Sequence, residues 1–224
     1  MFEFASADDL IAAVVVLAVM LLVAFPFHEF AHALAAFRLG DGTARLFGRL
    51  TLDPRAHFDM FGGLLLVLTV LSSGGTFGFG WAKPTPVSPH QLAGGRRGEA
   101  IVAFAGPASN LVLATAAALP LRFILENEMA VPSLVVQVLL TFVVLNVALL
   151  VFNLIPIPPL DGSKVLFTFL SPATAWRVRP LLEQYGGFIL VAAIFLPISP
   201  NGSSLIDVVF EVVAGPILGL LLGL

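Results

Sequence analysis

The sequence predicts an all-α polytopic membrane protein with five or so transmembrane helices, a re-entrant segment and a small β-hairpin at the membrane surface. Hydrophobic residues make up 58% of the 224 residues, charged residues only 11%, and the mean hydropathy is +1.02. These values lie outside the range of soluble domains. Several uncharged runs are long enough to cross a bilayer, which takes about 20 residues per helix. The chain has no cysteine, which excludes disulfides and thiolate metal ligands.

The first predicted span begins near the amino terminus. Residues 10–27 carry no charged or polar side chain, and the apolar pattern resumes over residues 33–37. Together they form a helix long enough to cross. Pro26 is expected to kink this helix. The kink either opens space for a site or only serves packing.

A HExxH motif lies in the second half of this span, at His28, Glu29 and His32. On a helix, positions i and i+4 are about 40° apart around the axis, so both imidazoles can reach one metal ion. The spacing is typical of zinc sites in which the glutamate acts as general base. Composition alone would place this motif in roughly one such chain in 600. Ionisable groups in an apolar helix are by default functional.

Residues 38–58 change character, with turn signals at residues 40–42 and at Asp53-Pro54 and β-prone stretches between them. This pattern predicts the hairpin at the membrane surface. His57 and Asp59 are expected to make structural hydrogen bonds rather than to bind metal. Asp53 is a second choice for an acidic metal ligand.

Residues 60–82 are uncharged but interrupted by six glycines and a Ser-Ser pair. Only residues 64–71 are solidly apolar, which is short for a span and suits a re-entrant segment packed against protein. A proline-rich, extended loop follows over residues 83–90.

Two further spans carry polar residues at membrane depth. Residues 100–121 contain Asn110, whose amide needs a hydrogen-bonding partner; it either links helices or holds a substrate backbone near the metal. Residues 131–160 end in NLIPIPPL, where the prolines must break the helix before Asp161. Irregular backbone at this depth is tolerated only against a cavity or protein. Asp161 is therefore the best candidate for a third metal ligand.

The carboxyl-terminal part is predicted as a basic loop containing Lys164, Arg177 and Arg179, followed by apolar stretches at residues 185–197 and 205–224. Residues 1–224 are treated as one domain. Its catalytic core spans about residues 8–170, and its C-terminal helices span about residues 184–224.

The distribution of charge predicts the topology. Basic residues mark the cytoplasmic side, and ten of the eleven fall in residues 38–55, 83–97 and 164–179. If residues 60–82 do not cross, these clusters share the cytoplasmic side and the amino terminus is outside. The motif and Asp161 then lie toward that side. No cleavable signal peptide is expected, because the first nine residues are acidic, and no basic block suggests nucleic acid.

Three protein ligands, His28, His32 and Asp161, would leave one zinc position for water, as in catalytic sites. Glu29 would then act as general base. One zinc ion per chain is expected. Because the site lies in a bilayer, its substrates are expected to be transmembrane helices, which must unwind before cleavage.

With HEFAH, GPASN and NLIPIPPLDG in successive spans, the chain resembles the site-2 protease family of intramembrane zinc metalloproteases, most closely its short bacterial and archaeal members. The resemblance covers residues 20–170. It implies His28, His32 and Asp161 as zinc ligands, Glu29 as the base, and Asn110 and Asn153 near the substrate. It also implies cleavage near the cytoplasmic face of a prokaryotic plasma membrane. The chain departs from longer members because it has no room for a PDZ domain between these spans.

Two other functions compete with a zinc-dependent endopeptidase. The first is a catalytically silent binder of membrane proteins with the same fold. The second is a metal transporter that uses the same ligands.

Overall fold

The computed structural model describes residues 7–74 and 78–223, and it is helical throughout apart from turns and extended connections. In this part of the chain the only bridge pairing joins Pro197 to Ser204, and there is no sheet. In chain order the elements are α1 Ala7–Ala18, the π-helix η1 Val19–Ala24, α2 Phe25–Arg38, α3 Thr43–Leu46, α4 Pro54–His57, α5 Met60–Ser72, the 3-10 turn η2 Pro89–Gln91, α6 Arg96–Glu126, α7 Ser133–Asn153, α8 Asp161–Phe169, α9 Pro172–Phe195, α10 Leu205–Val209, the π-helix η3 Phe210–Ala214 and α11 Gly215–Leu222.

Five helical stretches of the described chain are long and apolar enough to cross a membrane, as predicted: Leu10–Arg38, Arg96–Glu126, Ser133–Asn153, Pro172–Phe195 and Leu205–Leu222. Their outward-facing side chains are largely apolar; Leu119 on α6, Phe188 on α9 and Leu220 on α11 are 65%, 77% and 79% exposed. Large apolar side chains exposed in this number indicate contact with lipid. The chain is therefore an integral membrane protein.

The first span contains a π-helical turn directly before Pro26. Elements α1, η1 and α2 form one continuous helix, in which η1 ends at Ala24 and α2 begins at Phe25. A proline removes one backbone donor, and a local widening of the helix can absorb the mismatch. The irregular turn thus falls just before the two motif histidines, where the sequence predicts a distortion.

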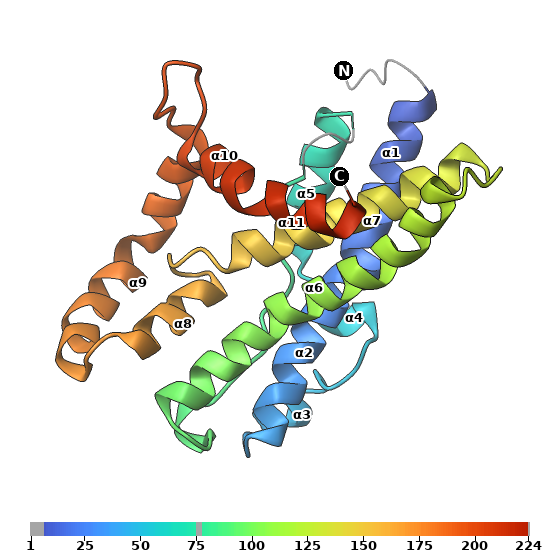
Figure 1. Ribbon diagram of the computed structural model, residues 1–224. Helices are drawn as coiled ribbons and strands as arrows, with labels where there is room; N and C mark the ends of the chain where they lie inside the picture. Colours follow the sequence, from blue (N-terminus) through green and yellow to red (C-terminus); the bar gives the residue numbers. More distant parts are fainter. Residues whose placement is uncertain (1–6, 75–77, 224) are drawn as a thin grey trace.

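Helix α6 is the centre of the molecule and packs against α2, α7 and α8 (Figure 1). Small residues on α6, including Ala114 and Ala118, pack with Val143 and Val147 of α7. Small side chains let helices approach closely in a membrane, where packing rather than water exclusion drives association. Separately, the first half of α6 packs on α2 and lies against the motif histidines.

The predicted β-hairpin over residues 38–58 is wrong. The segment instead forms two single-turn helices, α3 and α4. Asp53 caps α4 by accepting a hydrogen bond from the Arg55 N–H at 2.9 Å, and Pro54 occupies the first turn. A capping residue followed by proline starts a helix, and this local signal outweighs the β propensity of the neighbouring residues.

Helix α5 is 13 residues long, and the chain then returns along it. The backbone of Phe79 donates to the hydroxyl of Thr69 at 2.9 Å. The N–H of Lys83 donates to the carbonyl of His57, which precedes α5, at 2.8 Å. The segment 78–83 therefore ends beside the start of α5. The predicted extended loop over residues 83–90 is confirmed for residues 83–88, whereas Pro89 and His90 begin the 3-10 turn η2.

The predicted basic loop after residue 164 is helical. Lys164 lies in α8, while Arg177 and Arg179 lie in α9, which starts at Pro172 rather than near residue 184. Ser171 caps α9 by accepting from the Thr174 N–H, and Pro172 fits the first turn. These capping signals were available in the sequence, but the charge of the segment obscured them.

Candidate metal centre

His28 and His32 lie one turn apart on α2 and face each other. Their Nε2 atoms are 3.0 Å apart, and their rings are nearly perpendicular with centroids 4.7 Å apart. Both residues are only 7% exposed. The motif therefore presents two ring nitrogens to one point inside the helix bundle.

Asp161 approaches the same point from the other side of the site. Helix α7 ends at Asn153, and the irregular segment 154–160 leads to Asp161 at the first position of α8. The Oδ2 atom of Asp161 lies 3.3 Å from the Nε2 of His28 and 3.0 Å from that of His32. The next residue, Gly162, packs so closely on the carbonyl of Leu154 that no side chain would fit there. This contact holds the first turn of α8 against the end of α7.

Helix α6 supports both imidazoles from behind. The Nδ1 of His32 lies 2.7 Å from the carbonyl oxygen of Val102, and the Nδ1 of His28 lies 2.7 Å from the Oδ1 of Asn110. A carbonyl oxygen only accepts, so His32 carries its proton on Nδ1. In a neutral ring, Nε2 then presents a lone pair to the site. The outer hydrogen bond of a metal-binding histidine has this arrangement.

Gly106 lets α6 come this close. A Cβ atom at this position would stand 2.6 Å from the Nε2 of His28 and closer still to His32. Only glycine leaves room at such a close approach. The space beside the two Nε2 atoms is therefore kept free of protein atoms by the absence of a side chain at position 106.

These three residues fit a zinc ion. Ligand atoms about 2.0–2.1 Å from a tetrahedral zinc lie about 3.3 Å from one another, close to the 3.0–3.3 Å separations of the two Nε2 atoms and Oδ2. Two imidazoles and one carboxylate are also a donor set typical of zinc. Without a cation, two lone pairs and a carboxylate would face one another in a buried space. His28, His32 and Asp161 could thus hold one metal ion.

Glu29 lines the same space as His28, His32 and Asp161. Its Oε2 accepts a hydrogen bond from the Thr85 N–H at 2.7 Å, and the Thr85 hydroxyl donates to the Glu29 carbonyl at 3.0 Å. The extended segment after α5 therefore orients Glu29. Within the described part of the chain, no protein group bonds to its Oε1.

The three candidate ligands and Glu29 line a cavity of about 420 Å³. The extended segment contributes Trp81 and Thr85, and the end of α7 contributes Phe152 and Asn153. The Nδ2 of Asn153 donates to the Leu149 carbonyl at 3.0 Å. The cavity is of a size typical of ligand sites. It combines apolar side chains with the polar residues of the candidate metal centre.

The remaining sequence candidates lie elsewhere. Asn110 is fully buried behind His28 and is not among the residues that line the cavity. Asp53 caps α4 and is not part of the ligand group found among the described residues. The structural roles predicted for His57 and Asp59 are confirmed, because His57 bonds to the Thr51 carbonyl and Asp59 caps α5.

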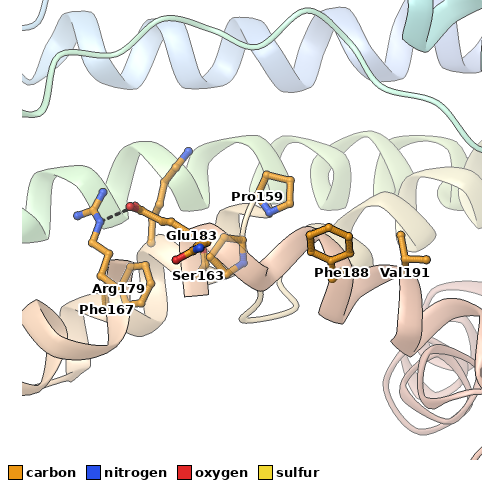
Figure 2. Close-up of a pocket in the computed structure, with 11 residues that line it drawn as sticks. Pro159, Ser163, Phe167, Arg179, Glu183, Phe188 and Val191 are labelled. Carbon is orange, nitrogen blue, oxygen red and sulfur yellow. Dashed lines mark hydrogen bonds and ion pairs between the residues drawn. The ribbon is translucent and has the colours of Figure 1, made fainter. Parts of the chain in front are cut away.

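A second hollow, of about 630 Å³, lies between α8 and α9 (Figure 2). Arg179 and Glu183 form an ion pair of 2.7 Å at one end, whereas Phe188 and Val191 line the other. Pro159 contributes to both this hollow and the metal cavity. Among the described residues, the hollow between α8 and α9 holds no second group of metal-binding side chains.

Sequence reasoning did not identify three residues of the site: Gly106, Thr85 and Asn146. Asn146 is fully buried on α7, and its Oδ1 accepts from the Nδ2 of Asn110 at 3.0 Å. It lies seven residues before Asn153, two helical turns away on the same face. A polar residue on the face already marked by Asn153 was a signal for it.

Comparison with known proteins identifies a family and several relatives of this chain. Residues 120–197 match the family described as Peptidase family M50. The chain is 36% identical over 191 residues to a Bacillus subtilis protein named "Putative zinc metalloprotease YwhC", covering 84% of this chain and 82% of that one. It is 35% identical over 176 residues to "Putative zinc metalloprotease Rip2" of Mycolicibacterium smegmatis, covering 79% and 65%. No solved structure matches significantly.

The similarity to YwhC spans most of both chains. The matched family segment contains Asp161, and the HExxH helix α2, which lies outside that segment, brings its two histidines within 3.3 Å of the Asp161 carboxylate. The metalloprotease motif, the third candidate ligand and the helical membrane fold all agree with that relationship. The chain therefore belongs to peptidase family M50, the site-2 protease family of zinc metalloproteases.

Proposed function

We propose that this protein is a zinc-dependent endopeptidase that cleaves transmembrane segments of membrane proteins near the cytoplasmic face of the membrane. One observation carries the proposal. The two Nε2 atoms and the Asp161 Oδ2 lie 3.0–3.3 Å apart beside a cavity that Glu29 also lines. The cavity lies within apolar helices, so its substrates are expected to enter from the membrane.

His28, His32 and Asp161 would hold the zinc ion. When bound, zinc supplies Lewis-acid chemistry, which lowers the pKa of water toward about 7 and polarises the scissile carbonyl. The Oδ1 of Asp161 lies 3.3 Å from the Nζ of Lys164. This contact directs the other oxygen, Oδ2, toward the histidines.

Glu29 would act as the general base. The Thr85 N–H holds Oε2, which leaves Oε1 to take a proton from the attacking water and to return it to the leaving amine. A carboxylate fixed through one oxygen has little freedom to turn away, so its free oxygen is positioned before the substrate arrives.

Asn153 is the better candidate for contacting the substrate. It lines the cavity, whereas Asn110 is behind His28 with its carboxamide bonded to His28 and Asn146. One Nδ2 hydrogen of Asn153 bonds to Leu149, and the other remains for a substrate carbonyl. A transmembrane substrate must expose such carbonyls by unwinding, because its own helix otherwise satisfies them.

The contacts among the basic segments support an orientation with the site toward the cytoplasm. Arg96 donates to the Leu170 carbonyl, Ala93 donates to the Leu39 carbonyl, and Arg49 donates to the Lys83 carbonyl. These three contacts join residues 38–55, 83–97 and 164–179 at one end of the molecule. Under the positive-inside rule, that end faces the cytoplasm.

The return of segment 78–83 to the start of α5 supports a re-entrant path. Thirteen helical residues span about 20 Å, less than the hydrocarbon thickness of about 30 Å. Residues 60–82 would enter from the cytoplasmic side and leave on the same side. The amino terminus would then be outside.

The cleavage assay compares wild-type protein with Glu29→Gln and Asp161→Asn, using a model transmembrane substrate in detergent. Glu29→Gln is expected to abolish cleavage while keeping about one zinc per chain, because the proton acceptor is lost but no proposed ligand is. Asp161→Asn is expected to lose both zinc and cleavage. Unchanged cleavage by Glu29→Gln would contradict the proposal and favour a silent binder, and zinc flux in liposomes would favour a transporter.

The orientation is testable because the chain has no cysteine, so that an introduced thiol is the only one. His90→Cys lies in the segment between α5 and α6, and Asn127→Cys lies in the turn after α6. In intact cells, a membrane-impermeant thiol reagent should label Asn127→Cys and spare His90→Cys until the membrane is opened. The reverse labelling would overturn the orientation and leave the enzymatic proposal standing.

A further inference from the structure

We propose that Asn146 is a positioning residue of the metal centre, which acts through Asn110 to keep the ring proton of His28 on Nδ1. The inference rests on the proposed zinc site. It assigns a function to a residue that touches neither the candidate ligand atoms nor the cavity. The observation that carries it is a chain of three hydrogen bonds that runs from a backbone carbonyl of α7 to the ring of His28.

The chain of hydrogen bonds is short and sealed from solvent. The Nδ2 of Asn146 lies 2.9 Å from the carbonyl oxygen of Phe142, and its Oδ1 lies 3.0 Å from the Nδ2 of Asn110. The Oδ1 of Asn110 lies 2.7 Å from the Nδ1 of His28. Both asparagines are 0% exposed. Buried amide groups that water does not reach must hydrogen-bond to one another, so the orientation of each carboxamide fixes the orientation of the next.

The Phe142 carbonyl sets the direction of every bond in this chain. A backbone carbonyl can only accept, so the amide nitrogen of Asn146 must face it. The oxygen of Asn146 then faces Asn110 and requires the amide nitrogen there. The oxygen of Asn110 is consequently left for His28, where it accepts the Nδ1 proton. Reversing either amide would place two donors or two acceptors together in a buried space, where an unsatisfied polar group is costly.

The two histidines therefore differ in how their protonation is determined. His32 is directed by the backbone carbonyl of Val102, which no side-chain substitution removes. His28 is directed by a carboxamide, which can accept or donate depending on its orientation. An asparagine at position 110 alone would not specify which form of His28 is present. Asn146 supplies the missing constraint.

A purely structural role is the alternative, in which Asn146 only joins α6 to α7. Buried asparagines do link membrane helices, and in that case its loss would lower stability without a specific effect on zinc. A positioning role makes a different prediction, because partners of this kind typically change metal affinity about 10- to 100-fold. Zinc affinity and stability must therefore be measured on the same variants.

The experiment measures the zinc dissociation constant of the purified full-length chain in detergent by competition with a chelator, beside its thermal unfolding. Asn146→Leu should weaken zinc binding about 10-fold. Val147→Ala is the matched packing control; it removes buried volume from the adjacent position of α7, and it should lower stability without weakening zinc binding. Asn146→Asp should keep near wild-type affinity, since a buried, neutral carboxyl can donate to Phe142 and accept from Asn110.

A double-mutant cycle tests whether Asn146 affects His28 through Asn110. In the Asn110→Leu background, Asn146→Leu should have no further effect on zinc affinity, because the connection to His28 is already lost. Unchanged affinity in Asn146→Leu, an equal loss in Val147→Ala, or additive losses in the double variant would each overturn the inference while the zinc site stands. Absence of zinc binding by wild-type protein would overturn the proposed site and this inference with it.

Discussion

Two pairs of membrane-spanning helices differ in how much of their surface other parts of the protein cover. The first pair carries the motif histidines and the residues that support them, and the second pair lies at the C-terminal end of the chain. In an apolar 18-residue window of Leu10–Arg38, and likewise of Arg96–Glu126, 39% of the residues are buried inside the protein, against 17% in such a window of Pro172–Phe195 and 6% in Leu205–Leu222. The first pair carries buried histidines and amides in fixed hydrogen bonds, whereas the second presents mainly apolar side chains outward. Lipid imposes only apolarity on a helix, whereas a neighbouring helix imposes shape and polarity at single positions.

Matched glycine substitutions are expected to show the largest difference between these regions. Gly106→Ala would place a methyl group against the Nε2 atoms of both motif histidines. It should remove most bound zinc and lower cleavage about 100-fold or more, because displacing reacting groups by about 1 Å has effects of that size. Zinc content and turnover on the model substrate measure both.

The control is Gly215→Ala at the start of α11, where an added Cβ meets no atom within 4 Å. It should leave zinc content and turnover unchanged. Equal losses in the two variants would show that the C-terminal helices constrain the site as tightly as α6 does. Full activity in Gly106→Ala would show that α6 can move away from the histidines without disturbing the site.

A smaller effect is expected from the buried carboxylate that anchors the extended segment. Asp41 accepts from the N–H groups of Thr43 at 2.9 Å and Ser88 at 2.6 Å. Burial opposes ionisation, but the hydrogen bonds from Thr43 and Ser88 outweigh it and lower the pKa of Asp41 from its usual 3.8. A lowered pKa means that the native state favours the ionised form. The stabilisation is complete above about pH 4 and is lost as the pH falls through the lowered pKa.

Asp41→Asn should therefore destabilise the protein by about 1–2 kcal/mol at pH 7. The effect should be smaller near pH 3, which lies below the usual pKa of 3.8, because there the unfolded chain binds the proton and part of the stabilisation is lost. Thermal unfolding in detergent at the two pH values measures the difference. Asp207→Asn is the counterpart in the C-terminal region, where the exposed carboxylate accepts hydrogen bonds from the N–H and hydroxyl of Ser204, the residue that caps α10. Its effect should be smaller, and a pH-independent loss in Asp41→Asn would contradict the assignment.

Helical periodicity and proline placement were enough to predict much of the site from the sequence. The i, i+4 spacing of His28 and His32 holds on any α-helix, whatever surrounds it. The prolines before Asp161 prevent helix continuation wherever they occur, and α7 ends at Asn153 as this requires. Both inferences depend on local backbone geometry, which the residues determine by themselves.

The errors and omissions have different causes. The hairpin over residues 38–58 failed because capping by Asp53 competes with β propensity, and propensity is the weaker signal. Thr85 and Gly106 escaped notice because their roles arise from contacts with Glu29 and the histidines across 56 or more residues of sequence. No local pattern records a partner at that distance.

The sequence alone determined the class of protein, the presence of five membrane-spanning helices and the candidate ligands, because apolarity, helix period and chain breakage are properties of short segments. Only the tertiary structure decided that α6 lies against both imidazoles, that Thr85 holds Glu29 and that Asn146 orients Asn110. Those assignments depend on which helices meet and at what depth. Packing among distant segments sets both, and a one-dimensional pattern does not encode it.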